Sequence, residues 1–221
     1  MTAQRDWKGF YFITDENYSV DGFLKDVQAA LASRAAMVQY RRKNRVIELT
    51  SRYLIEAVAI RDLCRAHGVP FIVNDDIEFA LDVGADGLHV GPDDLSPGEA
   101  RKLLGPDLIL GVSVATPEEA RAAVESGADY VAASPIFSTP TKFDTGTPVG
   151  FDGLSSIREA VGVPLAAIGG LNSSNARNVG RCGAELLCAI SASYADNKLS
   201  RNIERLSRLH QEGLLEYRAV K

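Results

Sequence analysis

Short runs of apolar, mostly β-branched residues alternate along the chain with longer stretches in which apolar residues recur every three or four positions. The short runs have the length and composition of buried strands, and the longer stretches have the period of amphipathic helices. In the stretch 46–67, one helical stripe carries Leu49, Tyr53, Leu54, Ala57, Ile60, Leu63 and Cys64. We predict eight strands, each followed by a helix, with the strands at 9–14, 37–41, 70–74, 87–91, 108–113, 130–134, 164–169 and 186–191.

Residues typical of helix ends separate these elements. Thr116, followed by Pro117 and Glu119, has the sequence of a helix N-cap, and Asp21 and Ser96 offer similar caps. Glycines suited to a left-handed C-terminal residue follow four helical stretches, at Gly68, Gly84, Gly127 and Gly183. We therefore predict an α/β protein with a single (β/α)8 TIM barrel domain over 1–221, in which 1–8 are an N-terminal lead-in. An open doubly wound sheet is the alternative, although a glycine-rich dinucleotide fingerprint does not follow the first strand.

Composition and charge narrow the function classes. Of 221 residues, 46% are apolar, and 24 basic against 29 acidic side chains give a net charge of −5. This acidic balance, with basic residues scattered along the chain, disfavours nucleic-acid binding. No apolar run approaches the roughly 18 residues of a membrane span, and the three cysteines lack metal-site spacing and fit reduced thiols. We expect a cytoplasmic protein without nucleic-acid or membrane partners, and the sequence leaves a homo-oligomer open.

Polar residues gather where the predicted strands end, which is where a barrel of this class carries its active site. On the second strand, the two-residue alternation places Gln39, Arg41 and Lys43 on one face and Val38, Tyr40 and Arg42 on the other. Three polar groups facing a barrel interior are costly unless they meet a ligand or partners. The pattern fits a ligand site, and it fits equally an internal layer of salt bridges with an acid such as Asp75.

Two carboxylates follow the next two strands, at Asp75 and Asp94. Adjacent strands lie about 4.8 Å apart, so these acids would repel each other unless a cation lies between them. Mg²⁺ suits such a site because it binds oxygen and commonly uses one or two carboxylates together with substrate phosphates. The alternative is that either acid caps the following helix, as Asp76 or Asp93 also could.

Later loops offer groups that could bind phosphate. The irregular stretch 138–150 contains Thr139, Thr141 and Lys142, and it fits either a lid over the barrel or a solvated surface loop. Gly169 and Gly170 allow close approach of the main chain to an anion after the seventh strand, although a glycine turn needs no ligand. His89 fits a hydrogen-bonded core histidine better than a base. No nucleophile signature is present around any serine or cysteine.

Taken in order, the motifs resemble thiamine phosphate synthase. The matching segments cover nearly the whole chain: YFITD at 11–15, VQYRRK at 38–43, NDDIEFALDVGADGLHVGPDDL at 74–95, GVS at 111–113, GADYVAASPIFSTPTK at 127–142, AIGGLNSSN at 167–175 and GAELLCAIS at 183–191. In that family a (β/α)8 barrel joins 4-amino-2-methyl-5-(diphosphooxymethyl)pyrimidine to a thiazole phosphate and releases pyrophosphate. The resemblance thus implies a transferase of thiamine biosynthesis with two small-molecule substrates.

The resemblance also implies roles for individual residues. Those that would bind the pyrimidine diphosphate are Gln39, Arg41, Lys43, Asn74, Ser113 and Lys142, of which Arg41, Lys43, Ser113 and Lys142 would be catalytic. Asp75 and Asp94 would carry Mg²⁺ as the cofactor. The thiazole phosphate would be bound by Thr139, Thr141, Gly170, Ile190 and Ser191. The candidate substrate-binding set also includes Tyr40 and Arg42, where Arg42 would add positive charge if its side chain folded inward.

Pro92 and Arg42 depart from the family pattern, and Ala115 bears on the alternatives. Pro92 stands where Gln is usual and stiffens the turn before Asp94, and Arg42 stands where Glu is common. A sister thiazole tautomerase uses a histidine just after the Gly-x-Ser strand, where this chain has Ala115. Because a methyl group cannot move protons, the synthase is favoured over this isomerase. A non-catalytic barrel that binds thiamine intermediates as a regulator is the second alternative.

Overall fold

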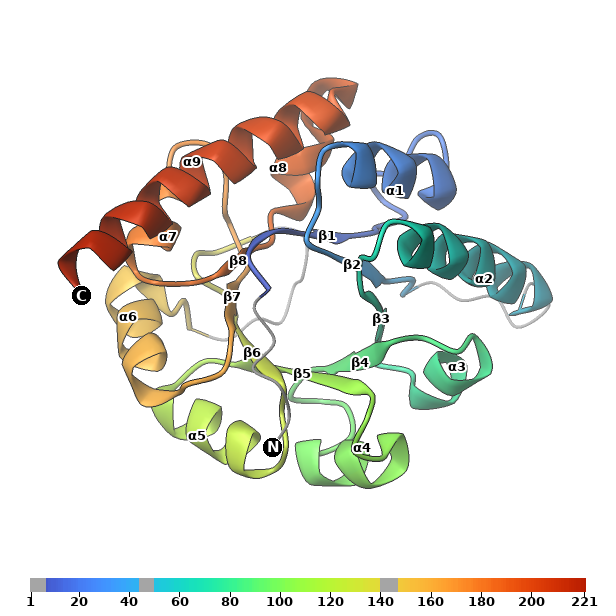
Figure 1. The fold of residues 1–221 in the computed structure, drawn as a ribbon, viewed down its shortest axis with the longest axis horizontal. Helices are drawn as coiled ribbons and strands as arrows, with labels where there is room; N and C mark the ends of the chain where they lie inside the picture. The colour runs from blue at the N-terminus through green and yellow to red at the C-terminus, as the bar shows by residue number, and fades with distance from the viewer. Residues whose placement is uncertain (1–6, 44–49, 140–146) are drawn as a thin grey trace.

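The alternating strands and helices close into a (β/α)8 barrel, as predicted. The computed structural model describes residues 7–43, 50–139 and 147–221. Its parallel strands pair in sequence order, and the first pairs with the eighth to close the barrel (Figure 1). The strands are β1 (Gly9–Ile13), β2 (Met37–Tyr40), β3 (Phe71–Asn74), β4 (Gly87–Val90), β5 (Ile109–Val114), β6 (Tyr130–Ala133), β7 (Leu165–Ala167) and β8 (Leu186–Leu187).

The helices form a ring outside the barrel (Figure 1). They are α1 (Phe23–Ala32), α2 (Thr50–Ala66), α3 (Ile77–Asp82), α4 (Pro97–Leu104), α5 (Pro117–Glu125), α6 (Gly150–Ala160), α7 (Ala176–Arg181), α8 (Ile190–Tyr194) and α9 (Leu199–Val220), with a 3-10 turn at Ala195–Asn197. The predicted end of the eighth strand at 191 is wrong, because α8 already begins at Ile190. Within the described ranges, no helix combines the length and apolarity needed to span a membrane.

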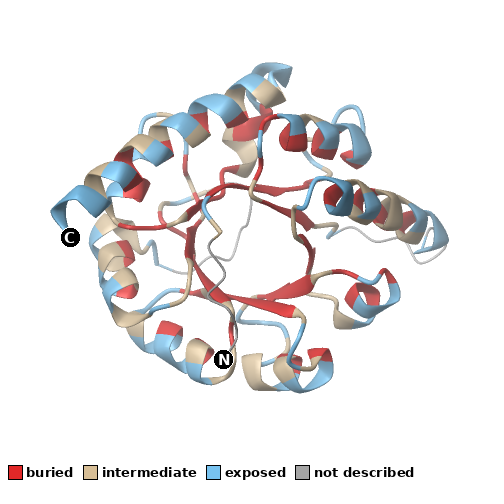
Figure 2. Cartoon of the chain, in the orientation of Figure 1, coloured by how far each residue is buried: buried red, intermediate tan, exposed pale blue. Residues whose placement is uncertain are grey.

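Side-chain alternation along the strands produces two separate layers of buried residues. Inward positions such as Tyr11, Met37 and Ile72 form a cluster inside the barrel. Outward positions such as Phe12 and Val38 pack against the helices in a larger cluster. The strands are therefore buried on both faces, as Figure 2 shows by the red barrel wall. This alternation fixes which residues at the strand ends can face the barrel mouth.

A repeated Gly-Ala-acid motif ties each returning helix to the sheet. The three glycines, Gly84, Gly127 and Gly183, have positive φ angles of 62°, 96° and 83°, as their helix-ending role predicts. The acid of each motif accepts a backbone N–H from the neighbouring strand, at 2.9 Å in each case: Asp86 from Phe71, Asp129 from Leu110 and Glu185 from Leu165. These contacts lie at the amino ends of the strands, opposite the barrel mouth, and their role there is structural.

The predicted helix caps have mixed outcomes. Ser96 forms a full capping box with Glu99, and Thr116 accepts the backbone N–H of Glu119 at 3.1 Å, so both caps are confirmed. The cap at Asp21 is wrong, because α1 has Gly22 at its N-cap and receives no side-chain cap there. Helix α2 is described from Thr50, so the first residues of the predicted 46–67 helix lie outside the described part of the chain.

Candidate active site

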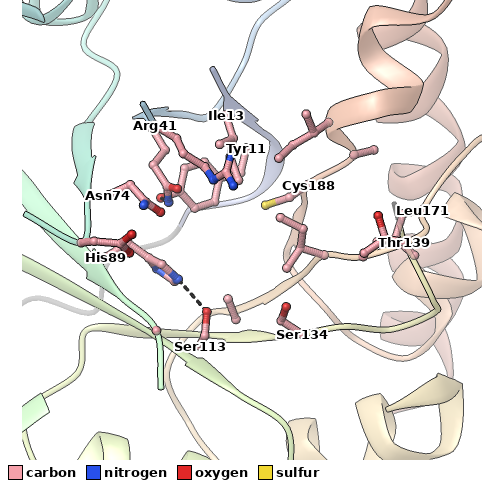
Figure 3. Close-up of a pocket in the computed structure, with 18 of the residues that line it drawn as sticks. Tyr11, Ile13, Arg41, Asn74, His89, Ser113, Ser134, Thr139, Leu171 and Cys188 are labelled. Carbon is pink, nitrogen blue, oxygen red and sulfur yellow. Dashed lines mark hydrogen bonds between the residues drawn. The ribbon is translucent and has the colours of Figure 1, made fainter. Parts of the chain in front are cut away.

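One pocket opens at the carboxyl ends of the strands and brings together most of the residues that the sequence singled out. Its walls come from strands β1 to β6 and from the segments that follow β7 and β8 (Figure 3). The predicted residues that line it are Gln39, Arg41, Lys43, Asn74, Asp75, Asp94, Ser113, Thr139, Gly170, Ile190 and Ser191. The face assignment of Gln39, Arg41 and Lys43 on β2 is thereby confirmed.

Two predicted substrate-binding residues, Tyr40 and Arg42, stand apart from this pocket. Tyr40 and Arg42 are on the outer face of β2 and meet α2, where the Tyr40 hydroxyl and the Arg42 guanidinium both donate to Glu56, at 2.9 and 2.7 Å. The Arg42 guanidinium also lies 4.3 Å from the centre of the Phe23 ring, a cation–π contact. Its charge is thus satisfied outside the barrel, and its inward folding is not observed. Thr141 and Lys142 lie outside the described residues.

Arg41 lines the pocket with its side chain held in place by other residues of the protein. Its guanidinium pairs with the carboxylate of Asp15, which is fully buried behind it and also accepts the backbone N–H of Asn17 at 3.0 Å. The backbone N–H of Arg41 donates to the Thr14 hydroxyl at 2.9 Å. Only 13% of the Arg41 side chain is exposed, and its direction is held by the residues directly after β1 before any ligand binds.

The neighbouring carboxylates form a coupled acidic pair. Burial raises the pKa of Asp94, and the hydrogen bond and charge of Asp75 raise it further. Burial also acts to raise the pKa of Asp75, but hydrogen bonds from Asp94 and Lys43 outweigh it and lower that pKa. The Lys43 ammonium pairs directly with Asp75, and the backbone N–H of Gly91 donates to Asp94 at 2.7 Å. Of the two carboxyls, Asp94 is therefore the one that binds a proton more readily.

This donor set fits a magnesium ion. Two oxygen ligands from adjacent strands suit a hard cation that keeps other positions for water and phosphate oxygens. Within the described ranges, no group of three or more His, Cys, Asp or Glu side chains could hold a metal. A protein cage is therefore not formed by these residues, so the remaining ligands would come from a bound phosphate or water. Asp75 itself has φ 65°, a left-handed conformation that Asp tolerates better than most residues.

The opposite wall is made of glycines and small polar groups. Gly169 and Gly170 have φ angles of 105° and 64°. A Cβ on Gly170 would lie 2.8 Å from Cβ of Phe137, because the loops after β6 and β7 are joined by backbone hydrogen bonds such as Phe137 N–H to Gly169 O, 3.0 Å. Packing between the loops thus requires these glycines. Beside them, Ile190 and Ser191 start α8, where the first N–H groups of a helix lack intrahelical partners.

The floor of the pocket is a chain of hydrogen bonds that crosses the barrel. Gln39 Nε2 donates to the Tyr11 hydroxyl at 2.8 Å, and the Tyr11 and Tyr130 hydroxyls are 2.7 Å apart. The Tyr130 hydroxyl is 2.9 Å from Nδ1 of His89, whose Nε2 is 3.0 Å from Oγ of Ser113 (Figure 3). The expectation of a hydrogen-bonded core histidine is confirmed.

Sequence reasoning missed Tyr130 as a part of the site, and it placed Asp15 at the end of the first strand without giving it a role. Tyr130 is at the inward start of β6, and its ring meets those of Tyr11 and His89 with centroids 5.9 and 5.6 Å apart. Burial raises the pKa of both tyrosines, so both remain protonated donors. The only sequence signal for Tyr130 was its inward register on a strand. Asp15 directly follows the first strand, a position where acids also cap helices.

The fold and the pocket define a barrel enzyme site with a cationic, carboxylate-bearing wall facing a glycine-rich wall. The family model described as thiamine monophosphate synthase matches residues 10–193. The chain is 43% identical over 205 residues to the thiamine-phosphate synthase of Chloroflexus aurantiacus, covering 92% of this chain and 93% of that protein. It is 46% identical over 187 residues to that of Moorella thermoacetica, covering 84% and 87%.

The structural comparison agrees with the sequence comparison. The thiamine phosphate pyrophosphorylase of Pyrococcus furiosus superposes with a TM-score of 0.84 at 33% identity, covering 95% of this chain and 98% of that chain. The chain belongs to the thiamine monophosphate synthase family. The resemblance seen in the ordered motifs is thus confirmed.

Proposed function

We propose that this protein is a thiamine-phosphate synthase, a transferase that couples a pyrimidine methyl diphosphate to a thiazole phosphate and releases pyrophosphate. The observation that carries the proposal is the pocket itself. It places Arg41, Lys43 and two carboxylates on one wall and the Gly169–Gly170 turn on the other, with Ser113 at the floor. A reaction between two anionic substrates needs two such anion sites at one barrel mouth.

The cationic wall suits the diphosphate. Arg41 is already oriented by Asp15, and Lys43 lies beside the carboxylate pair. Asp75 and Asp94 would hold Mg²⁺, which when bound would neutralise charge on the diphosphate oxygens. Lys43 could then turn from Asp75 toward the phosphate. Asn74 and Gln39 line the same side and could hydrogen bond the pyrimidine. Lys142 remains a predicted further cation.

The chemistry requires positioned charge more than a base. The bond between the pyrimidine methylene carbon and the diphosphate oxygen breaks, and its electron pair leaves with pyrophosphate. Arg41 and Lys43 stabilise that developing negative charge. The aminopyrimidine delocalises the positive charge left on the methylene, and the thiazole nitrogen lone pair then forms the new carbon–nitrogen bond. Because that nitrogen carries no proton, the absence of a general base in the mechanism is expected, and the protein mainly aligns the two partners.

The glycine wall suits the thiazole phosphate. The turn at Gly169 and Gly170, the start of α8 and the Thr139 side chain border the pocket together. Backbone N–H groups and a hydroxyl bind a phosphate monoester without adding a cation that would compete for the diphosphate. The predicted ligand Thr141 belongs to the same loop. The diphosphate would thus bind at the cationic wall and the thiazole phosphate at the glycine wall.

The environment of Ala115 argues against the isomerase alternative. Its backbone N–H donates to Glu119 at 2.7 Å, and the residue is exposed after the end of β5. Its methyl group offers no proton carrier at this position. The diphosphate wall would also have no role in an isomerisation of the thiazole phosphate alone. We further propose that the protein acts in the cytoplasm.

A steady-state assay with both substrates and Mg²⁺ tests the proposal. We expect thiamine phosphate and pyrophosphate in equal amounts, with strong loss of turnover in Arg41→Ala. The matched control is Arg121→Ala, which removes an exposed arginine that pairs with Glu118 at 2.6 Å and does not line the pocket. Isomerised thiazole phosphate as the product would establish the tautomerase instead. Binding of both substrates without turnover would establish a regulator.

A further inference from the structure

The hydrogen-bond chain under the pocket has a direction that its chemistry dictates. It begins at Gln39 Nε2, an amide nitrogen that can only donate, so the Tyr11 oxygen accepts there. The single proton of Tyr11 then goes to its other neighbour, the Tyr130 oxygen at 2.7 Å. Tyr130 in turn has one proton, which it donates to Nδ1 of His89 at 2.9 Å. Each bond therefore determines the next.

The consequence at the far end concerns Ser113. With Nδ1 accepting, a neutral His89 carries its proton on Nε2 and donates it to Oγ of Ser113 at 3.0 Å. The Ser113 hydroxyl accepts from His89 and so retains its own proton for another acceptor. Ser113 lines the pocket, so that proton is available to a ligand.

The opposite direction leaves a buried donor without an acceptor. If Ser113 donated to His89, the protons would run toward Tyr11, which would then accept from both Tyr130 and Gln39. The Tyr11 hydroxyl proton would need a third partner, and no other acceptor for it is found in the described part of the chain. Tyr11 is 1% exposed, so water would not replace that partner without entering the core. An unsatisfied buried donor is costly, and the forward direction avoids it.

The packing around Tyr130 holds its ring in the position that the hydrogen-bond chain requires. Its ring is held edge-on by Trp7, with centroids 6.0 Å apart, and stacks on His89. The ring fills the space beside Gly111 that a side chain would otherwise occupy. Burial raises the pKa of Tyr11 and Tyr130, which keeps one proton on each oxygen. Because each tyrosine hydroxyl has one proton, a hydroxyl that accepts a hydrogen bond from one neighbour donates its proton to the other.

We propose that Gln39, Tyr11, Tyr130 and His89 are positioning residues that fix the Ser113 hydroxyl as a hydrogen-bond donor toward the ligand. The site therefore selects a heteroaromatic ligand that presents an acceptor, such as a ring nitrogen, at Ser113. That ligand assignment rests on the proposed function, in which the ligand is the aminopyrimidine diphosphate. The direction of the chain itself does not rest on it.

The tautomer of His89 tests the direction without any ligand or activity. In ¹⁵N-labelled protein, long-range ¹H–¹⁵N correlation spectra distinguish a ring protonated at Nε2 from one protonated at Nδ1. We expect His89 in the Nε2–H form, with Nδ1 shifted as a hydrogen-bond acceptor. In Tyr130→Phe that acceptor shift should disappear, whereas Tyr194→Phe should leave it unchanged. Tyr194 is a matched control because its buried hydroxyl donates to Asp26 at 3.1 Å, outside the pocket lining.

Two results would overturn the direction. One is a wild-type His89 protonated at Nδ1, which needs no variant to fold. The other is an Nδ1 signal that does not respond to Tyr130→Phe. Neither result would touch the proposed function, because synthase activity is measured separately. Conversely, His89 could be in the Nε2–H form in a protein that fails to bind the pyrimidine diphosphate. That result would refute the proposed function and would still support the proposed direction of the hydrogen bonds.

Binding of ring analogues tests the donor at Ser113. Two analogues of the pyrimidine diphosphate, each with one ring nitrogen replaced by C–H, are compared with the parent by calorimetry. We expect one analogue to bind the wild type about tenfold more weakly. In Ser113→Ala, the same analogue should bind within about twofold of the parent, because the lost partner is the same. If both analogues bound the wild type as well as the parent, the donor assignment would be wrong.

Discussion

The phenol ring of Tyr130 on β6 lies against the Cα of Gly111 on the neighbouring strand β5, in the space that a Cβ at residue 111 would need. The two residues are direct partners in the strand register. The glycine therefore admits the ring that links Tyr11 to His89 under the pocket. Glycine usually weakens a strand, but Gly111 leaves the space that the Tyr130 ring needs beneath the pocket.

We predict that Gly111→Ala destabilises the protein by about 1–3 kcal/mol or more, because the methyl group overpacks a rigid, fully buried ring. Chemical denaturation of the variant checks this value. Gly98→Ala is the matched control, since a Cβ there meets nothing within 4 Å in α4, and we expect no loss of stability. In a Tyr130→Ala background, Gly111→Ala should cost much less. Equal costs in both backgrounds would contradict the steric explanation.

Asp15 holds Arg41 in the pocket, and we predict that Asp15→Asn weakens diphosphate binding although residue 15 touches no substrate group in the proposed site. The substitution leaves the Arg41 guanidinium partly buried without its counter-charge, a change that costs about 3 kcal/mol of stability by comparison with other broken buried pairs. We expect a raised KM for the pyrimidine diphosphate and a nearly unchanged KM for the thiazole phosphate, both measured by steady-state kinetics.

The control for Asp15 is an acid with the same kind of partner at the other end of the barrel. Asp129 pairs with Arg101 at 2.7 Å and accepts the Leu110 N–H, at the amino ends of the strands. Asp129→Asn should lower the unfolding free energy and leave both KM values as they are. A rise in KM for the diphosphate in Asp129→Asn would mean that loss of stability alone explains the effect of Asp15→Asn.

Asp75 and Asp76 are adjacent carboxylates with different roles, and this difference predicts separable defects. Asp75 faces the pocket, whereas Asp76 caps α3 by accepting the Phe79 N–H at 2.9 Å. Asp75→Asn should abolish the Mg²⁺ dependence of diphosphate binding and spare thiazole phosphate binding, both followed by calorimetry. Asn is chosen because it tolerates the left-handed backbone at this position, where Ala would add strain.

Asp76→Ala should instead lower stability by about 1 kcal/mol, the usual loss for a helix cap. Its metal dependence should match the wild type. If Asp75→Asn lost both ligands equally, the two anions would share one site and the division of the pocket into two walls would be wrong.

Much of the fold was predictable because apolar residues recur with two periods, every second residue in strands and every three or four residues in helices. The two-residue alternation of β2 correctly sent Gln39 and Arg41 inward, and the helix-ending glycines marked the returns to the sheet. The eighth strand was predicted too long because Ile190 and Ser191, the end of the apolar run, begin a short helix in the structure. Local propensity could not decide this, because the change from strand to helix there depends on the closure of the barrel.

The sequence predicted many of the residues that line the site, but not the long-range contacts between their side chains. Strand ends and the family motifs identified Asp75, Asp94 and Gly170, all of which line the pocket. The fate of Arg42 was not readable, because its cation–π contact with Phe23 and its pair with Glu56 join elements distant in sequence. The same holds for the contact of Tyr130 with Tyr11, which only the closed barrel brings together. Long-range side-chain partners leave no local signature.

His210 on α9 makes stability depend on pH. It is fully buried, and its Nε2 is 2.8 Å from the Ala184 carbonyl, while no partner for Nδ1 is found among the described residues. Burial lowers the pKa of His210, and the hydrogen bond to Ala184 offsets this only in part. Because the folded pKa is below the unfolded value near 6.5, the unfolded chain binds a proton first as pH falls. Stability contributed by the neutral ring is thus complete above that pH and is lost below it.

We therefore predict that the unfolding free energy decreases from pH 7.5 to pH 5.5, with this one group contributing up to about 1.4 kcal/mol per pH unit. His210→Gln can still donate to Ala184 and does not titrate, so its stability should depend less on pH over this range. His67→Gln, at an exposed residue just after α2, is the control for replacing a histidine with glutamine. Denaturant unfolding of the three proteins at several pH values measures the slopes. Parallel curves for the wild type and His210→Gln would show that other groups cause the pH dependence.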